Sequence, residues 1–488
     1  MLFNSFQFLL FFPIVTILYF VLPHRFRWQW LLMASCVFYM SFIPAYIAIL
    51  GLTVLIDYFA ALWIETPRIS VAKKKIVLIT SILSTCFVLF VFKYFDFFNT
   101  NFAAIAQLFG WNYSIAALKV ILPIGLSFHT FQSLSYVIEV YRGNQKAERH
   151  FGIYALYVMF YPQLVAGPIE RPQNLLHQFY AIHTFDYRRV TDGLKLMLWG
   201  MFKKIVIADR LAIAVNQVYG SPHDYTGCPL IVATVFFAFQ IYCDFSGYSD
   251  IAIGAAQVMG FRLMDNFNRP YFSKSIAEFW KRWHISLSTW FRDYMYIPLG
   301  GKRVKLWRWQ FNIFITFLIS GFWHGANWTY IVWGAINGFY LISSLWTQNF
   351  RKIVCRAICI DKFPVLHMYL RTCITFSLIC IAWIFFRANN IQDAWYILTH
   401  LFQGMHCGWK PIGCYRVLQM GLGRYDLIVA IISIGFMESI HAVQRHGSIR
   451  CMFAEKPIWF RWSVYYALVF GITFFGVFEK RQFIYFQF

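Results

Sequence analysis

The sequence predicts an all-α polytopic membrane protein, and three observations lead to this fold class. Of its 488 residues, 59% are hydrophobic and only 13% are charged, about half the roughly 25% that soluble domains carry. Aromatic residues make up 21%, which suits lipid-facing helices with aromatic belts at both membrane surfaces. Apolar runs approaching the roughly 20 residues that cross a bilayer recur along the whole chain.

The candidate membrane segments follow one another from the first residues onward. Residues 2–22 lack a basic leader and a small-residue cleavage site, so we expect them to form a retained helix. Pro162, Gly167 and Pro168 interrupt a later segment, and such breaks are tolerated only where backbone is buried in protein or lines a cavity. The segments are 2–22, 28–43, 45–64, 76–98, 119–141, 152–166, 192–218, 230–260, 309–322, 327–346, 371–387, 426–441 and 462–478.

Charge predicts how these segments are oriented. The formal net charge of +22 comes from Lys and Arg residues between the apolar runs, as expected of cytoplasmic loops beside anionic lipid. Basic stretches at 262–308 and 348–371 should therefore be cytoplasmic, which leaves the N-terminus and residues 388–425 external. We find no zinc-finger, RNA-recognition or helix-turn-helix pattern, so a nucleic-acid partner is not expected.

Two regions between these basic stretches are of special interest. With basic loops on both sides, 309–346 should enter the membrane and return as a hairpin. Its first arm, 309–322, spans only about 21 Å as a helix, which would place the turn after it, and His324, inside the membrane. Residues 276–297 carry aromatic side chains at helical spacing among basic ones, so we expect one amphipathic helix at the cytoplasmic interface, with His284 on it.

Ionisable residues within apolar segments are costly and are candidates for function. His324 is followed by Gly325 and flanked by Trp323 and Trp328. In such apolar surroundings an imidazole stays neutral, the form that a general base needs. A structural histidine is the alternative. Tyr242–Asp250, with several polar residues inside an apolar helix, either lines a cavity or joins helices through hydrogen bonds. The other ionisable candidates are Asp57, His129, Glu139, Asp244, Asp250 and Glu438.

Other kinds of site lack a signature. The 11 cysteines are scattered and form no CxxC pair, so no metal site is expected. Ser-His-Asp elbow, P-loop, HExxH and Rossmann glycine patterns are missing from the sequence. We also find no internal repeat, the feature that would favour a transporter or flippase using its buried ionisable residues as an ion relay.

Several motifs together resemble the membrane-bound O-acyltransferase (MBOAT) family. One is Phe322-Trp323-His324-Gly325, preceded by Trp-Lys-Arg-Trp-His-Ile-Ser-Leu-Ser-Thr-Trp at 280–290. Its bacterial branch, which modifies alginate and peptidoglycan, is similar at five further stretches. These are 1–5, 166–172, 242–250, 266–272 and 483–488. The resemblance therefore runs from end to end.

The resemblance implies an MBOAT-type ring of about 11 transmembrane helices, plus re-entrant and interfacial helices, around a central tunnel. It implies one domain over 1–488, with a catalytic core at about 119–346 and a cytoplasmic or interfacial segment at 262–308. His324 matches the family histidine and is expected to be the general base. His284 matches a second histidine of this branch, and we expect it to support His324 by orienting the acyl carbonyl or by pairing with His324 across the tunnel. Candidates to line the tunnel are Tyr242, Asp244, Ser246, Asp250, Asn268, Trp323 and Asn327.

The resemblance also implies a reaction. An acyl group, expected to be acetyl, would come from a cytoplasmic thioester, either acetyl-CoA or an acyl carrier protein, with no bound cofactor. It would pass through the bacterial inner membrane to an extracytoplasmic polysaccharide, with a separate SGNH-type acetyltransferase as partner. Arg269, Lys281 and Arg282 are candidates to bind the donor. The nearest alternative is D-alanyl transfer from a carrier protein to teichoic acid; a transporter or a structural scaffold would be of another class.

Overall fold

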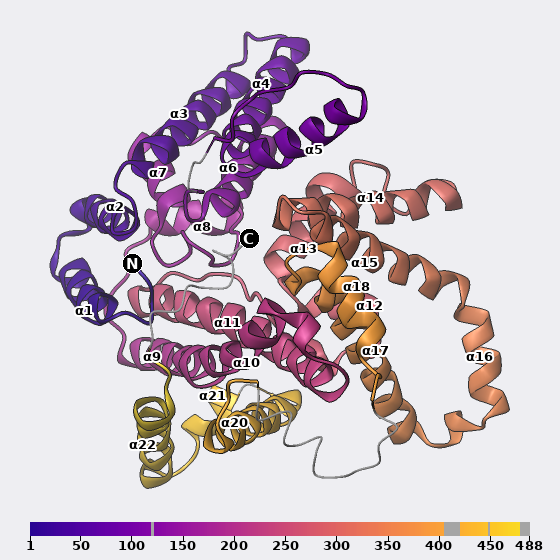
Figure 1. The fold of residues 1–488 in the computed structure, drawn as a ribbon. Coiled ribbons are helices and arrows are strands. Elements are labelled where there is room, and N and C mark those ends of the chain that lie inside the picture. Colours follow the sequence, from indigo (N-terminus) through magenta and orange to yellow (C-terminus); the bar gives the residue numbers. More distant parts are fainter. Residues whose placement is uncertain (119–121, 405–419, 448, 479–488) are drawn as a thin grey trace. The chain divides into compact units, whose positions relative to one another are not determined.

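The computed structural model describes residues 1–118, 122–404, 420–447 and 449–478. These residues form helices joined by turns, with no β-strand among them (Figure 1), which confirms the predicted all-α class. Most of the predicted external loop 388–425 beyond Gly404, and the motif at 483–488, lie outside the described residues. Within these described ranges, six helices or continuous helical runs are long and apolar enough to cross a membrane: Tyr46–Glu65, Val71–Leu108, Cys228–Met259, Pro364–Arg387, Arg424–His446 and Ile458–Phe475.

The chain divides into two compact units. Unit 1 comprises Met1–Met197 and Tyr248–Asp265, and unit 2 comprises Leu198–Gly247 and Asn266–Phe488. The long helix α11 (Cys228–Met259) contributes residues to both. The predictions of one domain over 1–488 and of a central tunnel remain predictions.

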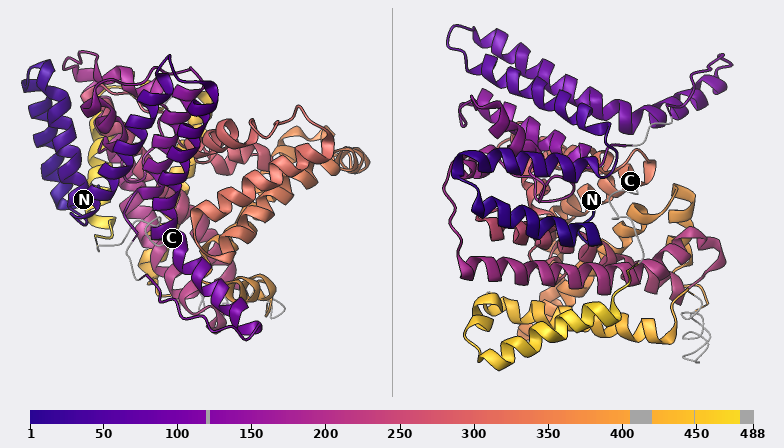
Figure 2. Two further views of the ribbon diagram at one scale, coloured as in Figure 1. Left: turned by 90° about the horizontal axis from the view of Figure 1, so that it is seen from above. Right: turned by 90° about the vertical axis from the view of Figure 1, so that its left-hand side faces the viewer.

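Unit 1 is built around helices α3, α4 and α6, and Figure 2 shows α3 and α4 side by side as a hairpin. The carboxylate of Asp57 on α3 accepts hydrogen bonds from Ser81 and Thr85 on α4 and from Ser133 on α6. A buried carboxylate needs such donors, and these three join the helices. The helices of this unit are α1 (Phe6–Val21), α2 (His24–Met40), α3 (Tyr46–Glu65), α4 (Val71–Leu89), η1 (Phe90–Tyr94), α5 (Phe95–Leu108), α6 (Leu126–Tyr141), α7 (Phe151–Met159), α8 (Pro172–Leu175), η2 (Leu176–Phe179) and most of α9 (Tyr187–Met201).

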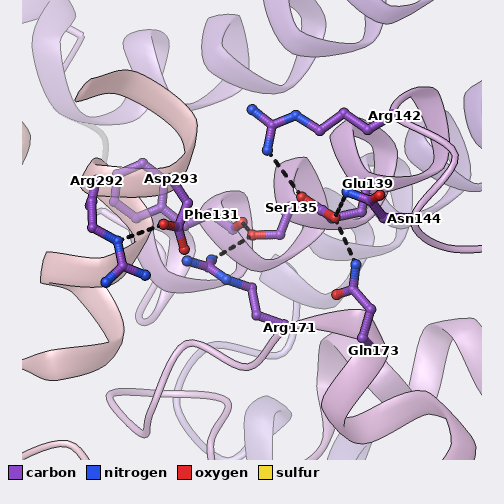
Figure 3. A network of polar contacts seen from close by, with 9 residues as sticks. All are labelled: Phe131, Ser135, Glu139, Arg142, Asn144, Arg171, Gln173, Arg292 and Asp293. Atoms are coloured by element: carbon purple, nitrogen blue, oxygen red, sulfur yellow. Dashed lines mark hydrogen bonds and ion pairs between the residues drawn. The ribbon is translucent and has the colours of Figure 1, made fainter. Parts of the chain in front are cut away.

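A second polar network lies at the C-terminal end of α6 (Figure 3). Glu139 accepts hydrogen bonds from Arg142 at 3.2 Å, Asn144 at 2.9 Å and Gln173 at 2.7 Å. Arg171, at the start of α8, donates to Ser135 on α6 at 3.2 Å. The ionisable Glu139 singled out from the sequence therefore connects α6 to the segment that follows α7.

Unit 2 contains both candidate histidines. Its apolar core is formed mainly by α10, the first part of α11, α17 and α20. The helices of this unit are η3 (Phe202–Ala208), α10 (Asp209–Gly220), η4 (Pro222–Asp224), η5 (Pro270–Phe272), α12 (Ile276–Arg282), α13 (Ile285–Phe291), η6 (Arg292–Tyr296), α14 (Leu306–His324), α15 (Trp328–Trp346), α16 (Gln348–Ala357), η7 (Ile360–Lys362), α17 (Pro364–Arg387), α18 (Ile391–His400), α20 (Arg424–Val443), η8 (Gln444–His446), α21 (Ile449–Ala454) and α22 (Ile458–Phe475).

The predicted hairpin over 309–346 is confirmed as the antiparallel pair α14 and α15 (Figure 1). Glycine lets the two backbones approach closely: a Cβ on Gly334 would lie 2.4 Å from the carbonyl oxygen of Phe317. The short first arm was wrong, because α14 begins at Leu306 and is about 28 Å long at 1.5 Å per residue. Its length therefore does not require the turn to lie inside the membrane.

The single amphipathic helix expected over 276–297 was also wrong. The structure has two seven-residue helices, α12 and α13, and a short π-helical turn, η6. The chain breaks at His284, which adopts a left-handed conformation with φ 42° and ψ 56°. The amide of Ile285 donates to the carbonyl oxygen of Asn266 at 2.9 Å. This bond to a distant segment replaces helical continuity, an outcome that helical spacing alone does not predict.

Candidate active site

His324 is the last residue of α14 and lies in an aromatic enclosure. Its side chain is buried, and its ring lies 4.9 Å from that of Trp323, 5.0 Å from Trp333 and 5.2 Å from Phe386, measured between centroids. Trp333 on α15 and Phe386 on α17 are themselves about 1% exposed. Three helices thus hold the histidine in a dry position among apolar rings.

Gly325 is what allows this packing. A Cβ at Gly325 would lie 2.2 Å from Cε2 of Tyr330, well inside van der Waals contact. Asn327 then starts α15: its side-chain oxygen accepts from the amide of Thr329 at 3.0 Å, and its Nδ2 donates to the carbonyl oxygen of Asn389 at 2.9 Å. The turn that follows His324, between α14 and α15, is therefore fixed by Gly325 and Asn327.

His284 lies at the break between α12 and α13 and is 1% exposed. Its Nδ1 is 3.1 Å from Oδ1 of Asn266 and 3.4 Å from Oγ of Ser286. Phe245 meets the ring edge-on at 4.5 Å, and Phe267 stacks on it at 6.2 Å. Burial lowers the pKa of His284 to about 3, so this imidazole is neutral at physiological pH.

A series of ring contacts connects the two histidines within unit 2. From His324 it passes to Trp333 at 5.0 Å, to Trp383 at 5.9 Å, to Trp283 at 5.1 Å, to Phe267 at 5.1 Å and to His284 at 6.2 Å. Helices α15 and α17 and the break that follows α12 are thereby joined by one aromatic wall. Direct pairing of His284 with His324 remains a prediction.

The polar stretch of α11 faces a charged network. Lys204, in η3, pairs with Asp244 at 2.7 Å and with Asp209 at 3.0 Å, and all three side chains are buried. Lys203 donates to the hydroxyl of Ser246 at 2.9 Å. The sequence left open whether Tyr242–Asp250 lines a cavity or joins helices through hydrogen bonds. Bonds that join helices are present at Asp244 and Ser246. Removing one partner of a buried ion pair of this kind strongly destabilises the folded protein.

Tyr242, one turn earlier on α11, connects this network to the aromatic wall. Its hydroxyl lies 3.2 Å from Nε2 of His441 on α20, and its ring contacts those of Phe267 and Trp283. His441 in turn lies 3.4 Å from Glu438. Asp250, predicted for the same site, belongs to unit 1, whereas Tyr242, Asp244 and Ser246 belong to unit 2.

Comparison with known proteins decides the family. A family model described as MBOAT, membrane-bound O-acyltransferase family, matches residues 150–385. A probable alginate O-acetylase of Pseudomonas aeruginosa is 38% identical over 438 residues, which cover 89% of this chain and 81% of the relative. The peptidoglycan O-acetyltransferase of Helicobacter pylori is 36% identical over 396 residues, 76% of this chain and 72% of the relative.

The chain belongs to the membrane-bound O-acyltransferase family. It is therefore a multi-pass membrane protein and an O-acyltransferase. The teichoic acid D-alanyltransferase of Bacillus subtilis is more distant, with 27% identity over 230 residues, 43% of this chain and 56% of the relative. Matched residues 150–385 include both His284 and His324.

The donor-binding candidates of this O-acyltransferase lie on α12 and on the segment before it. Arg269 is half-buried, and burial, followed by the charges of Arg282 and Arg445, lowers its pKa. Arg282 pairs with Glu278 at 2.7 Å, and Lys281 is exposed. Arg445, which sequence reasoning missed, thus adds to a local excess of positive charge around Arg269.

Sequence reasoning missed other residues of this O-acyltransferase. It chose Asn268, which is exposed and whose amide donates to the carbonyl oxygen of Arg282, whereas Asn266 is the residue beside His284. Nothing in the spacing distinguishes the two. Lys203 and Lys204 did carry a signal, because they lie within the predicted apolar segment 192–218 and ionisable residues there are costly.

One ligand-type cluster was not expected either. Atoms of Cys355, Asp361 and His367 that could bind a metal all lie within 4.8 Å of one another. Their separations of six residues each do not match a common metal motif. Asp361 is exposed and the other two are half-buried, and we assign this cluster no role.

Proposed function

We propose that this O-acyltransferase takes an acetyl group from a cytoplasmic thioester and passes it through the membrane for O-acetylation of an extracytoplasmic polysaccharide. The observation that carries this proposal is the similarity to a probable alginate O-acetylase over 89% of the chain. A second relative is named for peptidoglycan. The glycan is accordingly an alginate-like exopolysaccharide or peptidoglycan.

His324 acts as the general base in this proposal. A neutral ring nitrogen accepts the proton of the acceptor hydroxyl while the oxygen attacks the thioester carbonyl. The carbon–sulfur bond then breaks, and the leaving thiolate takes up a proton. The enclosure by Trp323, Trp333 and Phe386 supports this role, because it keeps water away from the thioester.

The donor approaches the cluster of Arg269, Lys281 and Arg282 from the cytoplasm. The phosphates of acetyl-CoA and the acidic surface of a carrier protein would both be attracted by this charge. Reaction with either thioester requires no bound cofactor. The crowding of positive charge at Arg269 supports an anionic ligand at this place.

The distribution of basic residues predicts how the chain is oriented in the membrane. The basic loops face the cytoplasm and the N-terminus lies outside the bacterial inner membrane, as the Lys and Arg distribution predicts. An extracytoplasmic SGNH-type acetyltransferase is the partner that would receive the acetyl group and act on the glycan. A carrier protein is a second partner if the donor is not acetyl-CoA.

D-Alanyl transfer to teichoic acid is the second candidate, because teichoic acid D-alanyltransferases match part of the chain. Their lower identity and shorter coverage favour O-acetylation. A transporter or flippase would need no thioester.

The test compares donors on the purified protein in detergent. We expect thiol release from acetyl-CoA or an acetyl-carrier thioester, but little from a D-alanyl-carrier thioester. Deletion of the gene should remove O-acetyl groups from a cell-surface glycan, and a plasmid copy should restore them. Selective use of the D-alanyl donor would favour the second candidate, and no thioester consumption at all would contradict both.

A further inference from the structure

The environment of His284 determines which of its nitrogens carries hydrogen. Oδ1 of Asn266 lies 3.2 Å from the backbone nitrogen of Ser286, which can only donate. The atom that it meets must therefore be the amide oxygen of Asn266 and not its NH₂ group. The hydroxyl of Ser286 donates to the same oxygen at 2.9 Å.

Nδ1 of His284 faces this oxygen as well, at 3.1 Å. A ring nitrogen with a lone pair would repel a carbonyl oxygen at this distance, so Nδ1 must donate. Because burial keeps the ring neutral, only one nitrogen carries hydrogen. Nε2, on the opposite side of the ring, is then a hydrogen-bond acceptor.

We propose that Asn266 is a positioning residue that holds His284 in the Nδ1–H tautomer, so that His284 serves acyl transfer as a hydrogen-bond acceptor through Nε2. This inference rests on the proposed function and narrows it. An acceptor cannot donate to the acyl carbonyl, which excludes the carbonyl-orienting role considered for His284. Its substrate partner must be an O–H or N–H group other than the attacking hydroxyl, because that hydroxyl has a single proton and donates it to His324.

The surroundings of His284 contain little that would change its charge. Phe245 and Phe267 cover the ring. Charged residues on the neighbouring elements have partners of their own. Asp244 on α11 pairs with Lys204, and Arg282 on α12 pairs with Glu278. Arg292 on η6 pairs with Asp293 (Figure 3), and Arg269 donates to Asn268. The tautomer is therefore controlled by the amide oxygen of Asn266.

Asn266→Asp tests the inference, because aspartate keeps the acceptor oxygen but adds a negative charge. That charge stabilises one extra proton on the pair formed by the introduced carboxylate and His284, and Nε2 then carries hydrogen. We expect the ratio of variant to wild-type turnover to fall at least about tenfold as the pH decreases from about 8.5 to about 6. Using the ratio removes any pH dependence that belongs to His324 or to the donor.

Two further variants serve as comparison. Asn266→Ala allows the ring of His284 to adopt either tautomer. It should lower kcat at least about tenfold with KM for the donor nearly unchanged. Ser286→Ala keeps the bond between Asn266 and His284 and should lose less than about threefold. A flat ratio for Asn266→Asp, or equal losses in Asn266→Ala and Ser286→Ala, would contradict the positioning role.

A measurement independent of activity covers the case in which a variant does not fold. Nitrogen-15 NMR of ¹⁵N-histidine-labelled wild-type protein distinguishes the tautomers, and the His284 signals are those missing from His284→Gln. We expect a protonated Nδ1 and an unprotonated Nε2. A protonated Nε2 with an unprotonated Nδ1 would overturn the inference even if acyl transfer is observed. The expected tautomer without any thioester consumption would leave the inference about Asn266 intact and refute the proposed reaction.

Discussion

His324 and His284 are surrounded in different ways, and the difference suggests different roles. His324 has ring contacts to Trp323, Trp333 and Phe386 and lies at the end of a long helix. His284 is held through Nδ1 by the polar groups of Asn266 and Ser286. In the proposed reaction His324 moves the proton, and the hydrogen bond at Nδ1 fixes how His284 presents its Nε2.

The close packing at Gly325 leads to a first prediction. Gly325→Ala should lower acyl transfer at least about tenfold, because the added methyl group collides with Tyr330 and displaces the adjoining His324. We expect a loss of about 1–3 kcal/mol in stability. Assays of turnover and thermal melting would measure both effects.

The control for this prediction shortens the Tyr330 side chain, which collides with the added methyl group. Combining Gly325→Ala with Tyr330→Leu makes room for the methyl group, so it should recover part of the activity. If Gly325→Ala alone were fully active, or if the combination were no better than the single variant, collision with Tyr330 would not explain the need for glycine.

The donor site gives a second prediction. Replacing Arg269 and Lys281 with glutamine should raise KM for an anionic thioester several-fold and weaken its dependence on salt, while kcat changes little. Arg356→Gln, at an exposed site on α16, is the matched control. An unchanged KM and salt dependence would mean that these charges serve the lipid surface.

At the scale of the elements, the break between α12 and α13 shows where sequence reasoning failed. Aromatic and basic residues at helical spacing predicted one helix over 276–297, and that pattern persists on both sides of the break. The competing bonds come from Asn266, about twenty residues earlier. Local periodicity carries no information on such a partner, so only the tertiary structure places His284.

The segment after α7 gives a third prediction, which concerns pH. Glu170 is buried and accepts hydrogen bonds from the amide of Met264 and the side chain of Asn174. Burial raises its pKa from 4.5 to about 7, so the folded protein binds this proton more tightly than the unfolded chain does. The stabilisation is fully present below about pH 4.5 and is lost as the pH rises through about 7.

Thermal melting of the detergent-solubilised protein across this range would test the prediction. The contribution of Glu170 is on the order of 3 kcal/mol, so wild type should lose stability from pH 4.5 to 7 relative to Glu170→Gln. Glu455→Gln, at an exposed position, should follow wild type. Parallel curves for wild type and Glu170→Gln would show that Glu170 is not the group responsible.

For the whole molecule, composition was sufficient to predict the class but not the organisation. The apolar runs predicted most of the long helices, including α11, α15 and α17, because burial in lipid leaves a continuous apolar signal. The division into two units at 197/198, 247/248 and 265/266 has no such signal, because α9 and α11 continue through it. Candidate histidines were found from motifs, whereas Asn266 and the Lys204 ion pairs required the structure.

Topology gives the fourth prediction. A cysteine introduced in place of Lys302 in a cysteine-free background should react with an impermeant maleimide only after the inner membrane is permeabilised, since 262–308 is predicted to be cytoplasmic. A cysteine near the N-terminus, in place of Asn4, should react in intact spheroplasts. Rapid labelling of the Lys302→Cys variant in intact spheroplasts would reverse the proposed orientation.

The central claim is acyl transfer with His324 as its base, and single-turnover transfer by His324→Ala tests it most directly. We expect the rate to fall roughly 10²-fold or more while donor binding and thermal melting persist. Because groups acting on one step are not additive, His324→Ala with His284→Ala should be little worse than His324→Ala alone. Near-normal transfer by a well-folded His324→Ala protein would contradict the account and leave His324 as a structural histidine.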